Sequence, residues 1–420
     1  MNQIFLYISL FYLYIFKCQI SLNFKKKYFL PDISYNLIEN IRYNYLSVNL
    51  YIGSNQEKFN FNLIFEEYST FLLGSEFNNS EIKVFNEKKS NSYERFDLDY
   101  YYSFYSKAYK SKDLFQFKNI YIKDFYFLLV KEQNNNFILY NLSTSGVIGL
   151  HIYPRSYSKG LEDYNFVKQL KANNYIDTET FYIKYNEDND EEGEIIFGYE
   201  NYIYLAKNKY ILQYKAQEQI KNLEWSINFF NCYSNYIKIN NINNVRFTLE
   251  SGMIIAPYEY HLNIESFFFL DLVNQKYCEL IELNNYSYYV CNNNIDINNF
   301  PILIFELKEL NFTFYGKDLF KLINDKYYFL ICFKESIKWW VLGKPFFKKY
   351  QVIFDMENQI IGFNIGKLFH KDYSYIALIF IICIIIITII IYYLKNNIYN
   401  KLNKMTEYEL IQNNKNDNEK

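Results

Sequence analysis

Short apolar runs separated by polar clusters dominate the central part of the chain. Each run spans three to eight residues and is rich in Tyr, Phe, Ile and Val, a length and composition typical of β-strands rather than helices. The runs are Leu46–Ile52, Phe59–Phe65, Phe115–Ile122, Phe125–Val130, Ile195–Phe197, Phe267–Leu270, Ile302–Phe305 and Tyr327–Phe333. The pattern predicts a body that is mainly β, with charged or Asn-rich loops between the strands.

Glycine is rare, with 12 in 420 residues, and two glycines end similar apolar tripeptides. Gly149 ends Val-Ile-Gly and Gly343 ends Val-Leu-Gly. An apolar strand that ends in a glutamate precedes each tripeptide, 83 residues earlier at Glu66 and 93 residues earlier at Glu250. A glycine kept in such a chain marks a backbone position that other residues resist. Because the same unit occurs twice, it predicts two related lobes.

The first residues of the chain have the pattern of a signal peptide. Ile4 to Phe16 is an apolar run without a charge, and Lys17 and a polar stretch follow it. This pattern predicts a signal peptide over residues 1–20, with a buried helix starting at Met1 as the alternative. Residues 21–44 would then form a short N-terminal extension.

The segment from Tyr375 to Leu394 contains twenty residues and no charge. That length is enough to cross a hydrocarbon core of about 30 Å. Tyr392 and Tyr393 lie at one boundary and lysines follow it, as in an aromatic belt with a positive cytosolic flank. We therefore expect a juxtamembrane segment at 367–374, a transmembrane helix at 375–394 and a cytosolic tail at 395–420. The expected location is the secretory pathway or the plasma membrane, as a single-pass type I protein with a lumenal or extracellular body.

Charge and histidine content exclude several classes of function. The 44 Lys and Arg residues nearly cancel the 46 Asp and Glu residues, so no bulk charge favours nucleic acid. Only His151, His261 and His370 are present. So few histidines make His-rich metal sites, haem ligation and His-based triads each improbable. We expect no metal, no other cofactor and no nucleic-acid partner.

Cysteines and glycosylation sequons agree with a secretory route. Four cysteines fall in the body, and an even number in an oxidising compartment predicts two disulfides, with three possible connectivities. They are Cys232, Cys278, Cys291 and Cys332. Sequons for N-glycosylation stand at Asn78, Asn141, Asn285 and Asn311.

Several segments, in order along the chain, resemble the pepsin-like aspartic proteases. The resemblance covers roughly residues 45–363, and its most specific part is the last block, which is similar to the family's W-I-L-G-D-x-F, Y-x-V-F-D and I-G-F. The similar segments are Tyr45–Gln56, Ser145–Leu150, Glu194–Gly198, Trp225–Ile227, Trp340–Phe347, Tyr350, Val352–Asp355 and Ile361–Phe363. The resemblance implies a mainly β, bilobal pepsin-like fold, with an N-terminal lobe at 45–200 and a C-terminal lobe at 201–366. It also implies that Cys291 and Cys332 form the disulfide of the C-terminal lobe.

The resemblance places Glu66 and Glu250 where the family has its two catalytic aspartates. Those aspartates share a proton, so that one acts as a base and the other as an acid. The extra methylene of glutamate moves each carboxylate by roughly an ångström, and misplacement of that size costs on the order of a hundredfold in rate. Both acidic positions are therefore expected to be inactive.

The loops around the two acids differ in how far they depart from the family. In the first loop Glu67 replaces a hydroxyl residue and Tyr68 replaces glycine, where a bulky residue forced to positive φ costs on the order of 1–3 kcal/mol. In the second loop Ser251 and Gly252 are kept. Tyr101 aligns with the tyrosine of the family's flap. Tyr68, Tyr101, Ser251 and Gly252 are the expected cleft residues.

Three functions are compatible with this sequence. The first is a membrane-anchored, catalytically inactive homologue that binds a protein or peptide in the old cleft. The second is an atypical endopeptidase that uses Glu66 and Glu250 as its dyad. The third is an adhesion or receptor ectodomain that acts through its aromatic surface.

The cytosolic tail contains one short motif. Tyr408 to Ile411 reads Tyr-Glu-Leu-Ile and resembles a Tyr-x-x-hydrophobic sorting signal.

Overall fold

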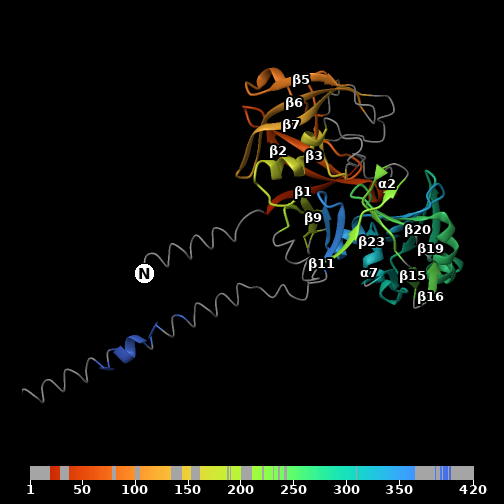
Figure 1. Ribbon diagram of the computed structural model, residues 1–420. Helices are drawn as coiled ribbons and strands as arrows, with labels where there is room; N and C mark the ends of the chain where they lie inside the picture. Colours follow the sequence, from red (N-terminus) through yellow and green to blue (C-terminus); the bar gives the residue numbers. More distant parts are fainter. Residues whose placement is uncertain are drawn as a thin grey trace, which may run out of the picture. The chain divides into compact units, whose positions relative to one another are not determined.

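The computed structural model describes most of residues 19–364 (Figure 1). The gaps are 29–36, 78–81, 100–104, 134–143, 153–160, 187–188, 190, 200–210, 220–221, 230, 235–236, 241–243 and 309. Beyond 364 the described residues are 384, 388–389, 391–395 and 397–398, all helical. The chain divides into one compact unit at Met1–Asn364 and a second at Ile365–Lys420.

Several predicted features lie outside the described residues. These are nearly all of the signal peptide, the segment 367–374, 13 of the 20 residues of the predicted transmembrane helix, Tyr101, Asn78, Asn141, Tyr408 and Ile411. Within the described part of the chain, no helix reaches the length and apolar character that a membrane crossing requires.

The first half of the body and the end of the body share one large sheet. Among the described residues it has 13 strands, in the order β11-β28-β27-β9-β10-β1-β2-β3-β8-β4-β7-β6-β5. The strands are β1 (Ile20–Tyr28), β2 (Asn44–Ile52), β3 (Glu57–Ile64), β4 (Phe71–Leu73), β5 (Glu94–Asp99), β6 (Tyr105–Phe117), β7 (Ile120–Gln133), β8 (Gly146–Gly149), β9 (Thr180–Tyr185), β10 (Glu192–Phe197), β11 (Ile211–Lys215), β27 (Val352–Asp355) and β28 (Ile360–Asn364).

The second half of the body forms separate sheets. A nine-stranded sheet contains β14 (Ser226–Ile227), β17 (Val245–Phe247), β18 (Ile254–Pro257), β19 (Cys278–Leu283), β20 (Tyr286–Asn292), β23 (Phe320–Ile323), β24 (Lys326–Phe329), β25 (Ile331–Lys334) and β26 (Trp340–Leu342). A four-stranded sheet contains β15 (Asn231–Ser234), β16 (Ile237–Asn240), β21 (Leu303–Leu307) and β22 (Leu310–Phe314). The hairpin of β12 (Glu218–Gln219) and β13 (Asn222–Leu223) stands apart.

Helices are short and lie between strands. The α-helices are α2 (Leu37–Arg42), α3 (Phe166–Ala172), α5 (His261–Ile264), α6 (Leu270–Asn274), α7 (Gly316–Leu319) and α8 (Lys344–Lys349). Single 3₁₀ turns are η1 (Glu87–Lys89), η3 (Glu162–Tyr164), η4 (Tyr258–Tyr260) and η6 (Ile297–Asn299), and η5 (Glu265–Phe269) is π-helical. The side chain of Asn165 begins α3 by accepting a hydrogen bond from the amide of Lys168, which satisfies a donor that the helix itself leaves unpaired.

The prediction of a mainly β body is confirmed, and most of the predicted strands are present. The run at Phe267–Leu270 is wrong as a strand, because it lies in η5 and α6. There Ile264, Phe268 and Phe269 are buried, a spacing that puts them on one helical face. Two runs predicted as single strands each contain parts of two. Phe115–Ile122 includes the end of β6, a turn at 118–119 and the start of β7, and Tyr327–Phe333 contains β24 and β25, interrupted at Leu330.

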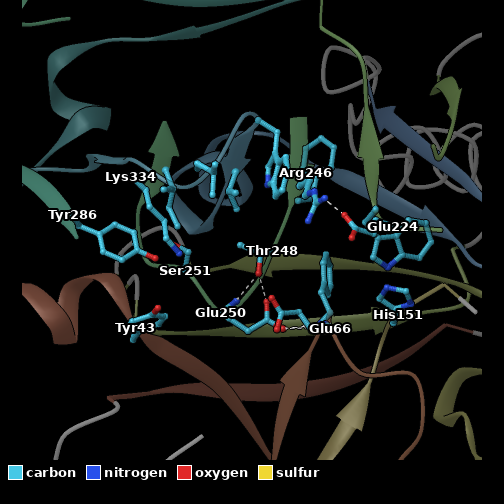
Figure 2. Close-up of a pocket in the computed structure, with 17 residues that line it drawn as sticks. Tyr43, Glu66, His151, Glu224, Arg246, Thr248, Glu250, Ser251, Tyr286 and Lys334 are labelled. Atoms are coloured by element: carbon cyan, nitrogen blue, oxygen red, sulfur yellow. Dashed lines mark hydrogen bonds and ion pairs between the residues drawn. The ribbon is translucent and has the colours of Figure 1, made fainter. Parts of the chain in front are cut away.

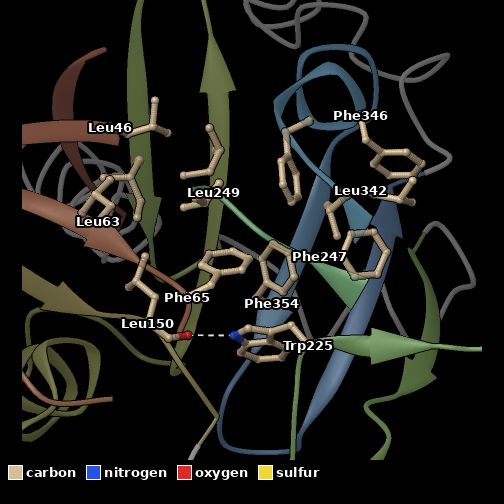
Figure 3. Packing of buried hydrophobic residues seen from close by; sticks show 14 of the residues in the cluster. Leu46, Leu63, Phe65, Leu150, Trp225, Phe247, Leu249, Leu342, Phe346 and Phe354 are labelled. Atoms are coloured by element: carbon tan, nitrogen blue, oxygen red, sulfur yellow. Dashed lines mark hydrogen bonds between the residues drawn. The ribbon is translucent and has the colours of Figure 1, made fainter. Parts of the chain in front are cut away.

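An aromatic cluster packs the two halves of the body together (Figure 3). Phe65 follows β3 and packs edge-on against Phe354 of β27, with ring centroids 4.8 Å apart. Trp225 packs against the same Phe354 ring at 4.9 Å, and its indole N–H donates to the carbonyl oxygen of Leu150 at 2.7 Å. Such edge-to-face pairs add roughly 0.5–1.5 kcal/mol each beyond their buried area. The cluster fixes the segment that follows β3.

The segment before residue 45 is part of the sheet. β1 pairs with β10 and with β2, both antiparallel, so it lies in the interior of the sheet rather than at an edge. After it, α2 ends in Arg42, whose side chain pairs with Glu39 in a buried ion pair.

The disulfide expected between Cys291 and Cys332 is wrong. Cys291 bonds Cys278 instead, while Cys232 and Cys332 are buried free thiols, so the prediction of two disulfides from these four cysteines is also wrong. Hairpin register explains the pairing. Asn284 and Asn285 connect β19 to β20 with φ of 50° and 63°, as a type I′ turn requires. This register sets Cys278 directly opposite Cys291.

Removing this disulfide will lower the stability of the body. The bond closes a loop with a sequence separation of 13, and loops of that length contribute about 3 kcal/mol through the unfolded state. We expect the double variant Cys278→Ala/Cys291→Ala to lose about that much unfolding free energy and to become insensitive to reductant. Cys332→Ala is the control, and it will keep the sensitivity to reductant. A Cys332→Ala protein that reductant no longer destabilises would contradict the pairing. Denaturant unfolding with and without dithiothreitol measures both quantities.

Candidate active site

Two equivalent loops follow β3 and β17, each braced by a parallel strand. β3 pairs in parallel with β8, and β17 pairs in parallel with β26. In the first loop the amide of His151 donates to the carbonyl of Glu67 at 2.8 Å. In the second, the amide of Lys344 donates to the carbonyl of Ser251 at 2.9 Å. The repeated unit in the sequence thus lies at two matching places in the fold.

Gly149 and Gly343 stand where these bracing strands touch the loops. A Cβ at Gly149 would lie 2.6 Å from the carbonyl oxygen of Glu67. A Cβ at Gly343 would overlap the carbonyl oxygens of Ser251 and Met253. Neither glycine has a left-handed φ, so the requirement for glycine is close approach of two backbones rather than backbone conformation.

The prediction that Tyr68 has a strained backbone with positive φ is wrong. Tyr68 is not among the described residues with positive φ. Its side chain is buried in the main core cluster, and its carbonyl accepts a hydrogen bond from the side chain of Asn165 at 2.8 Å. The first loop therefore adopts a conformation that accommodates a large side chain at this position.

The carboxylate of Glu250 reaches across to the first loop. One oxygen accepts from the amide of Phe65 at 2.5 Å and from the amide of Glu66 at 3.4 Å. The other oxygen accepts from the hydroxyl of Thr248. Burial raises the pKa of Glu250, which is only 8% exposed, and the nearby Glu66 raises it further. Both oxygens are thus engaged by protein donors.

The two acidic residues of the first loop have different surroundings. Glu66 is exposed and lines the cavity, whereas Glu67 is only 4% exposed. Burial raises the pKa of Glu67 to about 8, and Glu66 and Glu250 add to the increase. Oxygen Oε1 of Glu67 has no hydrogen-bond partner among the described residues. The predicted third carboxylate therefore lies beside the site, with burial rather than charge repulsion as the main cause of its raised pKa.

The cleft residues of the second loop make local contacts. The hydroxyl of Ser251 donates to the carbonyl of Met253 at 2.7 Å and accepts from its amide at 3.1 Å. The Ser251 hydroxyl therefore stabilises a turn within the second loop instead of bracing the first loop. Gly252 donates its amide to the carbonyl of Arg42 at 2.7 Å, and a Cβ there would overlap the carbonyl oxygen of Ile41.

These loops form the floor of a cavity of about 480 Å³ (Figure 2). His151 lies beside the glutamates, and burial lowers its pKa to about 4, so the imidazole is neutral at physiological pH. The lining residues are Tyr43, Phe65, Glu66, His151, Glu224, Trp225, Arg246, Phe247, Thr248, Glu250, Ser251, Ile255, Tyr286, Lys334, Ile337, Trp339 and Val341. The volume is in the range of cavities that hold small ligands.

Two groups of charged and aromatic residues in this cavity were missed by the sequence reasoning. Arg246 pairs with Glu224 at 2.7 Å and stacks on Trp339 at 3.7 Å. At the other side Tyr43, Tyr286 and Lys334 line the wall. Arg246 lies four residues before Glu250, in the strand that leads to it, and this proximity in sequence was the available signal. No comparable signal links Lys334 to the site.

Replacing Gly149 tests the backbone contact. We expect Gly149→Ala to lower the unfolding free energy by about 3 kcal/mol or more, because overpacking against backbone leaves no side chain to move. Gly74→Ala is the control, since its new Cβ would lie 3.1 Å from Cγ of Leu129 and 3.2 Å from the carbonyl oxygen of Val130, which is crowding rather than overlap. Equal losses in the two variants, measured by chemical denaturation, would refute the special role of Gly149.

Glu67 makes stability depend on pH. Its pKa is raised from 4.5 to about 8 on folding, so the folded state binds more protons between these values. The stabilisation is complete below pH 4.5 and is lost as the pH rises through 8. His151 acts in the opposite direction only below its ordinary pKa of 6.5. Between pH 6.5 and 8 we therefore expect Glu67 to lower stability by at most about 1.4 kcal/mol per pH unit. The raised pKa of Glu250 acts in the same direction, and the lowered pKa of the buried Lys344 acts in the opposite one.

The variant Glu67→Gln isolates this contribution. Denaturation curves between pH 6.5 and 8 should show that stability falls less steeply, or rises more steeply, with pH in Glu67→Gln than in the wild type. The exposed Glu335 supplies the control, because Glu335→Gln should retain the wild-type slope. Identical slopes in all three proteins would show that the buried Glu67 carboxyl does not titrate in this range.

Comparison with known proteins agrees with this geometry. No curated protein matches the sequence. The model of the family described as eukaryotic aspartyl protease matches residues 45–365, which include both glutamate loops and both bracing strands. The chain therefore belongs to the eukaryotic aspartyl protease family.

Proposed function

We propose that this protein is a catalytically inactive aspartic-protease homologue that binds a peptide segment of a partner in its cavity. In this proposal residues 375–394 anchor the protein in a membrane of the secretory pathway or at the cell surface, with the body lumenal or extracellular. The N-glycans would be at the predicted sequons, of which Asn285 and Asn311 are exposed in the body. The tail motif at Tyr408–Ile411 would direct sorting.

The observation that supports inactivity is the bonding of Glu250. A proton-sharing dyad needs two carboxylates that face each other and a water between them. Glu250 instead directs one oxygen at the amides of Phe65 and Glu66 and the other at Thr248. A carboxylate whose two oxygens already accept protein hydrogen bonds acts as a link between loops. Three protein donors thereby occupy most of its roughly four acceptor positions, which leaves little capacity to activate a water.

The cavity favours binding of an extended peptide. Its walls include the aromatic side chains of Tyr43, Tyr286 and Trp339, and its floor carries polar groups. Aromatic walls with a few placed polar groups are the usual composition of ligand sites. A peptide in extended form is recognised through its main chain and through alternate side chains.

The endopeptidase alternative also has one observation in its favour. Glu66 contributes to the raised pKa of Glu250, and a neighbouring acid that favours the protonated form of its partner is what a dyad requires. Under this alternative Glu66 would be the ionised base and Glu250 the protonated acid.

Peptide hydrolysis distinguishes the two. We expect the full-length protein to produce no cleavage of a mixed peptide library between pH 3 and 7 above that of Glu66→Gln, because both oxygens of Glu250 already accept hydrogen bonds from protein donors. An active member of the family serves as the positive control. Mass spectrometry of the products gives the readout.

A Glu250→Gln variant completes the design. Its amide oxygen can still accept from the Phe65 amide, so it should fold and bind peptides as the wild type does. Cleavage by the wild type that pepstatin inhibits, and that both Gln variants lose, would establish the endopeptidase instead. Partner binding that survives filling of the cavity, for example by Val341→Trp, would favour the adhesion-type ectodomain.

A further inference from the structure

Lys334 occupies a fixed position in the wall of the cavity. It is the last residue of β25, between two paired strands: it pairs with Pro257 of β18 and with Tyr286 of β20. Its ammonium group lies over the ring of Tyr286, 4.9 Å from the centroid. Both Lys334 and Tyr286 line the cavity. The charge is therefore held on a rigid sheet rather than on a loop.

The other cation at this wall is already neutralised. The guanidinium of Arg42 lies 3.8 Å from the Tyr286 ring and 3.7 Å from the Tyr43 ring. It forms a buried ion pair with Glu39. Arg42 therefore holds the two tyrosines in place but has no charge to offer to a ligand.

Lys334 has no such partner. In the described part of the chain no carboxylate oxygen lies within 4.0 Å of its ammonium group. A cation over an aromatic ring gains only about 0.5–2 kcal/mol. This contact does not neutralise the charge. The wall formed by Tyr43, Tyr286 and Lys334 thus carries one unmatched positive charge that faces the cavity.

The remaining charges lie elsewhere in the cavity. Figure 2 shows Lys334 and Tyr286 on one side, Arg246 with Glu224 on the other, and Glu66 with Glu250 between them. Arg246 and Glu224 neutralise each other at 2.7 Å. A ligand group near Lys334 therefore meets a positive charge, whereas the same group near the floor meets carboxylates.

We propose that Lys334 binds a carboxylate of the peptide ligand, and that the cavity selects peptides with an acidic group next to an apolar residue. This inference rests on the proposed peptide binding. The apolar neighbour would lie against Ile255 and Ile337, which line the same cavity. One unmatched ammonium group in a partly desolvated wall suits a single negative charge. The carboxylate can belong to an Asp or Glu side chain or to a free peptide C-terminus.

A combinatorial octapeptide library tests the proposal on the purified full-length chain. Half of the library has a free C-terminal carboxylate and half is amidated, which separates the two sources of the ligand carboxylate. We expect the wild type to enrich peptides with Asp or Glu, or only those with a free C-terminus. For an enriched peptide, Lys334→Gln should raise the Kd about tenfold, and Lys334→Glu should raise it further and favour Lys and Arg in a new selection.

Lys338→Glu is the matched control. Lys338 lies four residues further along, is exposed and does not line the cavity, yet the variant has the same change in net charge. We expect its Kd to stay within about twofold of the wild type, since exposed charges are screened by salt. Thermal unfolding of each variant shows that it is folded.

The possible failures are distinguishable. A wild type that binds peptides without any preference for a carboxylate overturns the role of Lys334 and leaves the proposed function standing. Equal losses in Lys334→Glu and Lys338→Glu overturn it too, because the effect would then come from net charge. A wild type that binds no peptide in either half of the library overturns the proposed function and this inference with it.

Discussion

The carboxylate of Glu250 joins the two halves of the body at the centre of the fold. Glu250 lies in the loop after β17, and its carboxylate accepts hydrogen bonds from the amides of Phe65 and Glu66 in the loop after β3. Behind it the rings of Phe65, Trp225 and Phe354 pack together. A buried carboxyl oxygen that accepts from backbone amides pairs donors that are costly to leave unsatisfied. Glu250 thereby forms a structural contact between the two halves of the body.

Sequence reasoning predicted the backbone features well and the side-chain contacts poorly, for a physical reason. The glycines at 149 and 343 could be singled out because contact with a neighbouring backbone excludes any Cβ. Tyr68 could not, since its φ depends on how the whole loop packs, and a core position for its ring removes the strain expected there.

The disulfide and the helical run at 267–270 are instructive failures. Cys278 and Cys291 are symmetrically placed about the Asn284-Asn285 turn, so hairpin register alone pairs them. That signal was present in the sequence but was outweighed by the family pattern. The three consecutive phenylalanines of Phe267–Phe269 read as a strand by composition, yet burial of Ile264 and Phe268 on one face selects a helix. The Lys334 site had no local signal, because strand pairing alone brings Lys334 to Tyr286.

The retention of Ser251 and Gly252 has a structural explanation that does not involve catalysis. Gly252 lies against the C-terminal end of α2, where it donates to the carbonyl of Arg42 and leaves no room for a Cβ beside Ile41. Ser251 closes its own turn through Met253. At the matching position of the first loop, the side chain of Tyr68 packs in the core. Packing of α2 therefore accounts for the glycine at position 252. A family-like second loop is then no evidence for a working dyad.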